Sequence, residues 1–260
     1  MTQQFLCVGG LEIPYVSRAR AVAAIDRSLE GAGQIRVAFA NANTMLQAMT
    51  STEYARAFNS FLVLNDGVGI DICSRLFNGR RFDENLNGTD FTPALLRESR
   101  HDFRIFLLGG KPGVAEDAAS KFAEAHPRHK VVGVHNGYFE DADAPDVIAR
   151  INASKADLVL VALGNPRQEQ FVATHARDIE APVILMVGAL FDFVAGRVIR
   201  APRFVRAARA EWMFRLLQEP RRLGRRYTLD VVRFLARLLW MKTSRRRRPS
   251  SIKRRLRPEN

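Results

Sequence analysis

The chain has 260 residues, 47% of them hydrophobic and 26% charged, which is enough for one large globular domain or two small ones around an apolar core. Its net charge of +13 is unevenly distributed, because residues 197–260 hold 21 of the 40 Lys and Arg residues but only 4 of the 27 Asp and Glu residues. The net charge is therefore +17 in that tail and −4 before it. This asymmetry predicts a tail that meets a polyanion, either nucleic acid or an anionic membrane.

Other features of the sequence exclude further classes of protein. Cys7 and Cys73 are too few and too far apart for a disulfide framework or a metal site, so a reducing compartment is expected. The stretch MTQQFLCVGGLEIP has no basic segment followed by a long apolar run, so we expect no signal peptide. No apolar run approaches the ~20 residues that a membrane-spanning helix needs. We therefore expect a cytosolic protein that can lie on a membrane surface.

Short apolar runs alternate with helical patterns through most of the chain. The runs predict strands at residues 5–8, 35–40, 61–64, 103–108, 130–134, 157–163 and 183–187. The patterns between them predict helices at residues 17–29, 44–58, 68–77, 90–100, 114–125, 144–154 and 168–177. This alternation predicts a Rossmann-like three-layer α/β fold with a mainly parallel sheet. We expect an α/β body over residues 1–196, a helical appendage over 197–243 and a basic, disordered tail over 244–260.

Polar and glycine-rich turns follow the expected strands, and the carboxyl ends of parallel strands meet at one edge of a sheet. We therefore expect these turns to line one pocket. Asp66 follows the apolar run at residues 61–64 and lies in the turn before the next helical pattern. Such an aspartate either faces a ligand or caps the helix that follows, and this stretch alone leaves both interpretations open.

Two strand–turn–helix stretches, LLGGKPGVAEDAA and VALGNPRQEQF, are suited to hold a phosphate at a helix N-terminus. The residues of the two turns are Gly109, Gly110, Lys111, Gly164, Asn165 and Pro166. Arg167, Gln168 and Glu169 then place polar side chains at the expected edge of the pocket. The first stretch matches neither a Walker A sequence nor a dinucleotide fingerprint. The stretch GVGIDI lacks the third glycine of that fingerprint, which argues against an NAD(P)-dependent oxidoreductase.

An Asp-x-Asp pattern at residues 141–143 is one by which many sugar-nucleotide enzymes hold a divalent ion. Here it lies in the acidic stretch EDADAPD before a helical pattern, where aspartates serve as caps and as partners of the helix dipole. We favour the capping interpretation. The five histidines have no ligand spacing, so the sequence predicts no metal site.

The basic tail contains an amphipathic pattern over residues 226–240, with Arg226, Asp230, Arg233 and Arg237 in one polar stripe. A wide apolar face beside a basic stripe is typical of a helix that lies at a membrane interface. A helix packed on the body with solvated arginines fits the same pattern, and both interpretations stay open. The runs RRRR and KRRLR that follow add roughly 1 kcal/mol of attraction per residue near an anionic surface.

The sequence resembles a known family over ordered blocks from about Val8 to Tyr227. The blocks are NANTMLQA, LNDGVGIDICSRL, NGTDFTPALL, FLLGGKPGVAEDAA, NGYF, VALGNPRQEQF and VGALFDFVAGRVIRAPRFVRAARAEWMFRLLQEPRRLGRRY. Together they are similar to the WecG/TagA/CpsF glycosyltransferases, glycosyltransferase family 26. The most specific pieces are the GNPRQE loop and the block with the pattern RAP…EW…R…EP.R.

The resemblance implies an inverting transferase that moves a sugar from a UDP-sugar to a polyprenyl-diphosphate-linked sugar. Such products enter exopolysaccharide, capsule or teichoic acid synthesis. The expected location is peripheral, on an anionic membrane surface at the cytoplasmic face of the inner (plasma) membrane. The resemblance implies no cofactor and no nucleic acid partner.

The resemblance also implies which residues carry the chemistry. The catalytic residues carried over from it are Asp66 as general base, Asn41, Gln168 and the appendage arginines Arg215, Arg222 and Arg225. The expected substrate-binding residues are Thr44, Gly109, Gly110, Lys111, Gly137, Tyr138, Gly164, Asn165, Pro166 and Glu169. Many relatives have a Thr two residues before the position of Asn41, where this chain has Phe39. The role of that hydroxyl is therefore not carried over, and Thr44 is the candidate substitute.

Two other classes of protein are alternatives. A nucleic-acid-binding protein would explain the sequence pI of about 10.7 and the Arg-rich tail. The mildly acidic body and the apolar face in the tail argue against it. A nucleotide-dependent oxidoreductase shares the fold class but lacks its fingerprint here.

Deletion of residues 197–260 is expected to lower transfer to a lipid-linked acceptor at least ~100-fold, because the appendage supplies the arginines that stabilise the leaving group. The body is expected to stay folded. Release of UDP in the presence of the acceptor measures the first effect, and circular dichroism measures the second. Full activity in the truncated protein would contradict the prediction.

Overall fold

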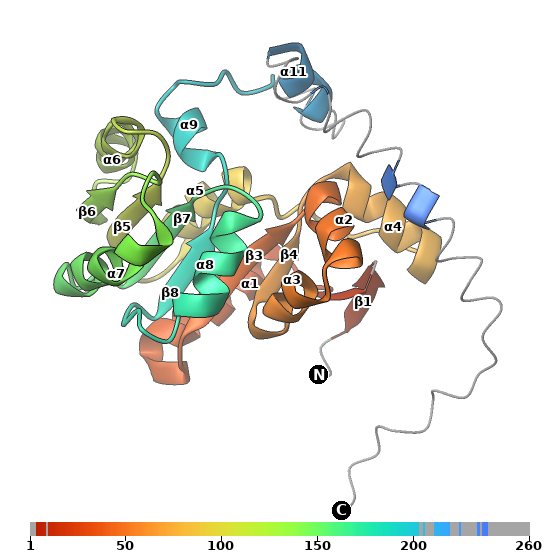
Figure 1. Cartoon of the computed structure of the whole chain (residues 1–260), viewed down its shortest axis with the longest axis horizontal. Helices are drawn as coiled ribbons and strands as arrows, with labels where there is room; N and C mark the ends of the chain where they lie inside the picture. Colours follow the sequence, from red (N-terminus) through yellow and green to blue (C-terminus); the bar gives the residue numbers. More distant parts are fainter. Residues whose placement is uncertain are drawn as a thin grey trace, which may run out of the picture.

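The computed structural model describes residues 4–8, 10–202, 205, 211–218, 224, 233–234 and 236–238. In this part of the chain, six parallel strands form one sheet in the order β4-β3-β8-β7-β5-β6, with helices on both faces (Figure 1). The strands are β3 (Ile35–Ala40), β4 (Leu62–Asn65), β5 (Arg104–Gly109), β6 (Lys130–His135), β7 (Leu158–Ala162) and β8 (Val183–Met186). The three-layer α/β fold expected from the sequence is confirmed.

Two apolar layers join the helices to the sheet, because successive side chains of a strand point to opposite faces. In β3, Ala38 and Ala40 belong to one buried cluster, whereas Val37 and Phe39 belong to the other. The first cluster includes residues of α2 (Ala42–Thr50), α3 (Thr52–Ala57), α4 (Val68–Asn78), α7 (Ala144–Ala153) and α8 (Arg167–His175). The second includes residues of α1 (Arg18–Arg27), α5 (Gly88–Glu98), α6 (Val114–Ala125) and α9 (Leu190–Val194). Three single-turn helices complete the body: η1 (Ser28–Ala32), η2 (Phe58–Ser60) and η3 (Asp141–Asp143).

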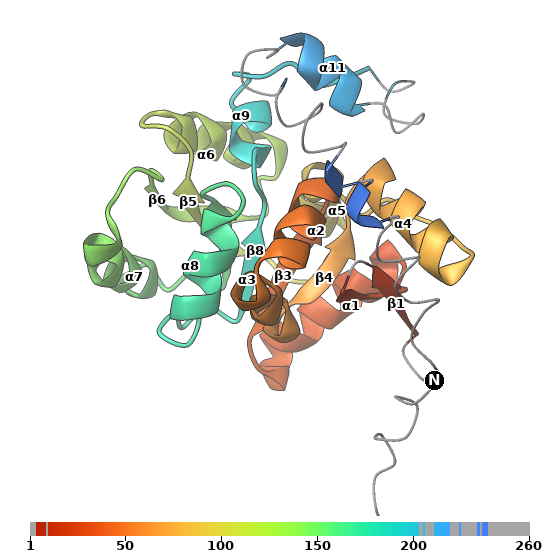
Figure 2. The same cartoon turned by 45° about the vertical axis from the view of Figure 1, so that its right-hand side comes forward.

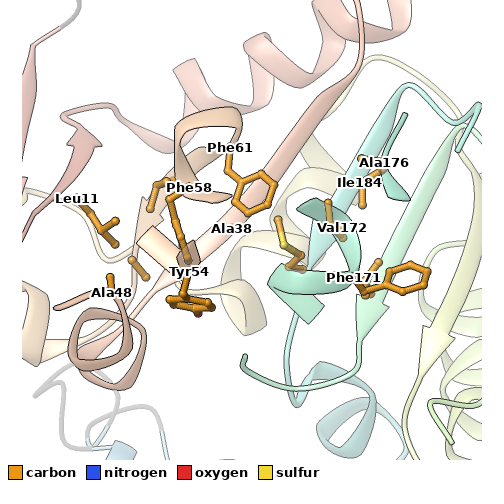
Figure 3. Packing of buried hydrophobic residues seen from close by; sticks show 14 of the residues in the cluster. Leu11, Ala38, Ala48, Tyr54, Phe58, Phe61, Phe171, Val172, Ala176 and Ile184 are labelled. Atoms are coloured by element: carbon orange, nitrogen blue, oxygen red, sulfur yellow. The ribbon is translucent and has the colours of Figure 1, made fainter. Parts of the chain in front are cut away.

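Aromatic side chains fill the first layer between the sheet and the α3–η2 region. The ring centroids of Tyr54 and Phe58 are 5.1 Å apart, and those of Phe58 and Phe61 are 5.6 Å apart, both pairs meeting edge to face (Figure 3). Such pairs stabilise a core beyond the burial of their area. Phe171 and Val172 of α8 belong to the same cluster, so this layer connects the helices that follow β3 and β7.

The N-terminal strand has the predicted bounds but a different partner. β1 (Phe5–Val8) pairs antiparallel with β2 (Leu11–Pro14) in a separate two-stranded sheet rather than joining the parallel sheet. The hairpin packs against β4 and α4. Strand β2 was not predicted, because its alternation covers only four residues beside the turn at Gly10, where φ is +98°.

Two other local differences have clear causes. The helix expected over residues 44–58 begins at Ala42 and is broken at Ser51, where the Ser51 hydroxyl accepts a hydrogen bond from the Tyr54 N–H at 3.2 Å and caps α3. Helix α9 begins within the stretch GALFD, which was expected to be a turn, because five helical residues are too few to show a helical period.

The described part of the appendage includes one helix and, farther along the chain, residues that pack on the body. Helix α11 (Glu211–Gln218) lies beyond α9 (Figure 1). Farther along the chain, Phe234 and Leu238 are 3% and 1% exposed and belong to the first buried cluster. An Nη of Arg237 donates a hydrogen bond of 2.9 Å to the carbonyl of Met49 near the end of α2. For these residues the structure supports the packed interpretation of the 226–240 pattern rather than the interfacial one. Deletion of residues 197–260 therefore also removes two core side chains, so the truncated body is expected to be less stable than the expectation of an independent body implied.

The remaining expectations for the tail lie outside the described residues, including the disordered tail over residues 244–260. Among the residues described, no helix is long and apolar enough to cross a bilayer.

The change Leu238→Ala is expected to lower the free energy of unfolding by about 2–4 kcal/mol, because it empties a fully buried site. Leu217 on α11 is 80% exposed and provides the matched control. The same change there is expected to alter stability by less than about 0.5 kcal/mol. Urea unfolding of both variants measures the difference. Equal, small effects would mean that residue 238 does not pack on the body in solution.

Candidate active site

Asp66 and Asn41 lie side by side at the carboxyl edge of the sheet. Asn41 follows β3 and Asp66 follows β4, and the last pair of residues in the register of these strands is Ala40 and Asn65. The Asp66 N–H donates a hydrogen bond of 2.8 Å to the Ala40 carbonyl, which extends the pairing by one residue. Both side chains belong to half-buried residues. The sequence predicted that these two turns share one pocket edge, and the strand register agrees.

The turn that holds Asp66 is fixed from both sides by residues 84–87. The Gly67 N–H donates to Oδ1 of Asn85 at 2.7 Å, and Gly67 has a φ of +85°, which favours glycine. On the other side, the Leu86 N–H donates to the Asn65 carbonyl at 3.0 Å, and Nδ2 of Asn65 donates to the Glu84 carbonyl at 2.7 Å. The sequence analysis missed this segment, whose only local signal is the polar run ENLN before α5.

The structure tests the interpretation of Asp66 as the cap of the helix that follows it. Helix α4 begins at Val68, and its N-cap residue is Gly67, without a side-chain cap. Asp66 is therefore not the capping residue of α4.

The N-termini of α2 and α4 meet at this edge. A Cβ atom built on Gly69 would lie 2.8 Å from Cβ of Ala42, so only glycine permits the helices to approach so closely. Helix N-termini carry partial positive charge and unpaired N–H groups, which favour an anion. The partial positive charge of these N-termini therefore acts on the carboxylate of Asp66 and on any anionic ligand at this edge.

Asn41 caps α2 with its side chain. Its Oδ1 accepts hydrogen bonds from the N–H groups of Asn43 at 3.0 Å and Thr44 at 3.2 Å. The Thr44 hydroxyl lies 3.4 Å from the same oxygen, and Thr44 is 1% exposed. Thr44 therefore contacts Asn41 from the buried side. A substrate contact of Thr44 was predicted at the open edge, and the structure places this side chain beneath that edge.

Asn165, in the GNPRQE loop, joins three helices through its amide. Its Oδ1 accepts hydrogen bonds from Nδ2 of Asn43 and Nε2 of Gln47, both on α2. Its Nδ2 donates to the Tyr54 hydroxyl of α3 and, at 3.1 Å, to Oε2 of Glu169 on α8. The side chain thus points into the protein, although the sequence analysis placed it among the substrate-binding residues.

Gln168 and Glu169, the last two residues of the GNPRQE loop, are also turned inward. Gln168 is 4% exposed and Glu169 is 1% exposed. Nε2 of Gln168 donates a hydrogen bond of 2.8 Å to Oε1 of Glu169. Oε1 of Gln168 accepts a hydrogen bond of 3.1 Å from the Gly188 N–H. Gln168 therefore ties α8 to the turn after β8. The structure places both residues beneath the edge, and a catalytic role of Gln168 stays a prediction.

Burial raises the pKa of two groups in this network. Loss of hydration in the core raises the pKa of Glu169, and the hydrogen bonds from Gln168 and Asn165 oppose the shift only in part. Burial and the nearby Glu169 carboxyl raise the pKa of Tyr54 far above its ordinary value. The network therefore contains a carboxyl whose neutral form is favoured by the fold.

The turns after β5, β6 and β7 are joined by close backbone contacts. A Cβ atom built on Gly109 would lie 2.4 Å from the carbonyl carbon of Ala162, and φ of Gly109 is +136°. The Gly110 N–H donates to the Ala162 carbonyl at 3.1 Å, and the Gly137 N–H donates to the Gly110 carbonyl at 2.8 Å. Three of the predicted substrate-binding glycine turns are therefore brought together.

Some side chains around these turns are exposed to solvent, and others form hydrogen bonds within the protein. Lys111 is exposed and Tyr138 is 66% exposed, so both are free to meet a ligand. Arg167, in contrast, donates hydrogen bonds to the carbonyls of Gly137 and Phe139. It joins the loop after β6 to the start of α8.

A family model for the "Glycosyl transferase WecG/TagA/CpsF family" matches residues 6–248. The chain belongs to the WecG/TagA/CpsF glycosyltransferase family. It is therefore an enzyme, and the resemblance seen in the sequence is confirmed over nearly the whole chain. Membership of this family disfavours the nucleic-acid-binding and oxidoreductase alternatives.

Two curated proteins are similar to this glycosyltransferase. One from Bacillus subtilis (strain 168) is 33% identical over 181 residues, which cover 67% of this chain and 70% of the relative. One from Bacillus spizizenii (strain ATCC 23059 / NRRL B-14472 / W23) is 32% identical over 188 residues, which cover 72% of each chain. Both are named N-acetylglucosaminyldiphosphoundecaprenol N-acetyl-beta-D-mannosaminyltransferase.

The Asp-x-Asp pattern of this glycosyltransferase serves as a cap. Oδ2 of Asp143 accepts a hydrogen bond of 3.0 Å from the Glu140 N–H, within a capping box at η3. Within the ranges that the structure describes, no group of three or more His, Cys, Asp or Glu residues could hold a metal ion.

The family arginines lie in or beyond α11. Arg215 is on α11, but its side chain is outside the described part of the structure, as are Arg222 and Arg225. Their catalytic role stays a prediction from the resemblance.

The free energy of unfolding of the Glu169→Gln variant relative to that of wild type is expected to increase as the pH rises above about 4.5, the ordinary pKa of a glutamate. The folded-state pKa of Glu169 is raised, so the folded protein binds this proton more tightly than the unfolded chain and loses stability as the pH rises toward the folded-state pKa. Gln cannot ionise and does not contribute this loss. Urea unfolding of both proteins at several pH values measures the difference.

The matched control is Glu53→Gln, because Glu53 is also in the first turn of a helix but is exposed. Its effect is expected to stay below about 0.5 kcal/mol at every pH. A difference between wild type and Glu169→Gln that does not vary with pH would contradict the expected ionisation of Glu169.

Proposed function

We propose that this glycosyltransferase moves a sugar from a UDP-sugar to a polyprenyl-diphosphate-linked sugar, with Asp66 as the general base. The observation that carries the proposal is the position of Asp66 beside Asn41 at an edge where two helix N-termini meet. A carboxylate there can accept a proton next to a field that favours the diphosphate of the donor.

The chemistry requires these parts. A sugar hydroxyl is a poor nucleophile, so a carboxylate must take its proton as the oxygen attacks the anomeric carbon. The bond between that carbon and the UDP oxygen breaks in the same step, and attack from the opposite side inverts the anomeric configuration. The departing UDP gains negative charge, which the N-termini of α2, α4 and α6, Lys111 and the appendage arginines can stabilise.

The names of the two relatives guide the choice of substrates. They describe transfer of N-acetylmannosamine to N-acetylglucosaminyldiphosphoundecaprenol. UDP-N-acetylmannosamine with that acceptor is therefore the first pair to test here. Other UDP-sugars, UDP-glucose among them, complete the panel.

A lipid-linked acceptor requires contact with a membrane, and the appendage has the features for it. Ile199, Met213 and Leu217 are exposed apolar residues, with exposed fractions of 71%, 50% and 80%. They lie in the region of the chain that has a net charge of +17. Apolar contact and attraction to anionic lipids together support peripheral binding at the cytoplasmic face of the plasma membrane.

The change Asp66→Asn is expected to lower kcat about 10²–10⁴-fold, because the amide cannot accept the proton of the acceptor hydroxyl. The KM for the UDP-sugar is expected to change little, since the substitution keeps the shape of the side chain. Release of UDP from each donor, with the polyprenyl-diphosphate-linked acceptor in detergent, measures both constants.

The control is Asp141→Asn, which alters an exposed aspartate of the Asp-x-Asp pattern and is expected to leave kcat unchanged. Acceptor-dependent release that survives Asp66→Asn would reject Asp66 as the base. An equal loss in the Asp141 variant, together with inhibition by EDTA, would indicate a metal site instead.

A further inference from the structure

Arg200 lies in the connector between α9 and α11 and contacts a carboxylate on each side. One Nη donates to Oδ1 of Asp90, in the first turn of α5, at 2.6 Å. Its Nε lies 3.7 Å from Oε1 of Glu211, the first residue of α11. The Arg200 side chain is 29% exposed, so solvent screens these pairs only in part. One guanidinium thus joins the body to the helix that bears Arg215.

Helix α11 is held to the same connector at its other end. Nε2 of Gln218, the last residue of α11, donates to the Ile199 carbonyl at 2.9 Å. The Ile199 N–H donates to Oε1 of Gln218 at 3.2 Å. Both ends of α11 therefore contact residues 199–200. Figure 2 shows α11 on the side of the molecule where α9 and α6 lie.

On the body side, Asp90 is connected through Asn87 and the 84–87 segment to the turn that holds Asp66. Oδ2 of Asp90 accepts a hydrogen bond from Nδ2 of Asn87 at 2.8 Å, and Oδ1 of Asn87 accepts from the Asp90 N–H at 3.0 Å. Asn87 is the N-cap of α5 and ends the 84–87 segment. That segment is hydrogen-bonded to Asn65 and Gly67, the two neighbours of Asp66.

We propose that Arg200 is a positioning residue that couples the placement of α11 to the turn that holds Asp66. The coupling runs from Glu211 through Arg200 and Asp90 to the 84–87 segment. Coupling between two sites is reciprocal. A shift of α11 therefore changes how strongly the 84–87 segment stabilises this turn, and a change in the turn alters the preferred position of α11. The coupling thereby links α11, which bears Arg215, to the turn that holds Asp66. The consequence for turnover rests on the proposed function.

A second ion pair on the same connector provides a matched control. Arg197 pairs with Asp117 of α6, and both side chains are about half exposed. This pair also fastens the connector to the body. In contrast to Asp90, Asp117 has no described hydrogen bond to the 84–87 segment. The changes Arg200→Gln and Arg197→Gln therefore remove one cation each from the same connector, but only the first breaks the path to Asp66.

Hydrogen exchange of the full-length protein, followed by mass spectrometry, tests the coupling without any substrate. Arg200→Gln is expected to speed exchange at least ~3-fold in peptides that contain residues 66–67 and 84–87, because their amide hydrogen bonds open more often. Arg197→Gln is expected to leave these peptides as in wild type. Equal exchange in the two variants would overturn the proposal.

Kinetics with the UDP-sugar that wild type uses provide the second measurement. Arg200→Gln is expected to lower kcat about tenfold, because small displacements of catalytic groups reduce the rate, while the donor KM changes less than about twofold. Arg200→Lys is expected to recover part of kcat, since it keeps the charge but not the two-pronged geometry. A rise in KM alone, or a kcat equal to that of Arg197→Gln, would overturn the proposal. If wild type releases no UDP from any donor, the proposed function fails, and hydrogen exchange still decides the coupling.

Discussion

The hydrogen bond from the Asp66 N–H to the Ala40 carbonyl is the contact on which the rest of the site depends. It continues the parallel pairing of β3 and β4 beyond the strands, so the same ladder that builds the sheet also places the carboxylate. Asn41 then lies beside Asp66 because it follows Ala40 directly. A parallel sheet brings its strand ends to one edge, where open α/β sheets bind their ligands.

The supporting structure beneath this edge consists of polar side chains that are buried rather than apolar ones. Asn165 and Gln168 satisfy their amide groups with partners on several helices, and Glu169 completes the network. Buried polar groups are costly unless they are paired, and a fully paired network favours one arrangement of the helices over others. The GNPRQE loop therefore combines a sequence pattern typical of the family with a structural role in joining α2, α3 and α8.

Much of the fold could be predicted from the sequence, because most strands are apolar runs bounded by turns. The bounds of β3 and α6 are those predicted, and the meeting of Asn41 with Asp66 follows from topology alone. The bounds of β1 were predicted, but its antiparallel pairing with β2 was not, since four residues of alternation are too few to identify β2. The inward direction of Asn165 and the hold of residues 84–87 on Asp66 depend on partners far away in the sequence. Local patterns carry no information about such contacts.

The glycine turns after β5 and β6 limit which parts of this edge a substitution can change. At Gly109 and Gly137, main chain packs on main chain, and a Cβ atom on Gly109 would overlap the backbone of Ala162. Surface made of backbone offers the same N–H and carbonyl groups whatever the sequence, so it cannot be tuned by substitution. If the proposed donor binds at these turns, the exposed side chains of Tyr138 and Lys111 can be substituted without loss of the backbone contacts, and these are the positions at which a change of side chain could alter the choice of sugar.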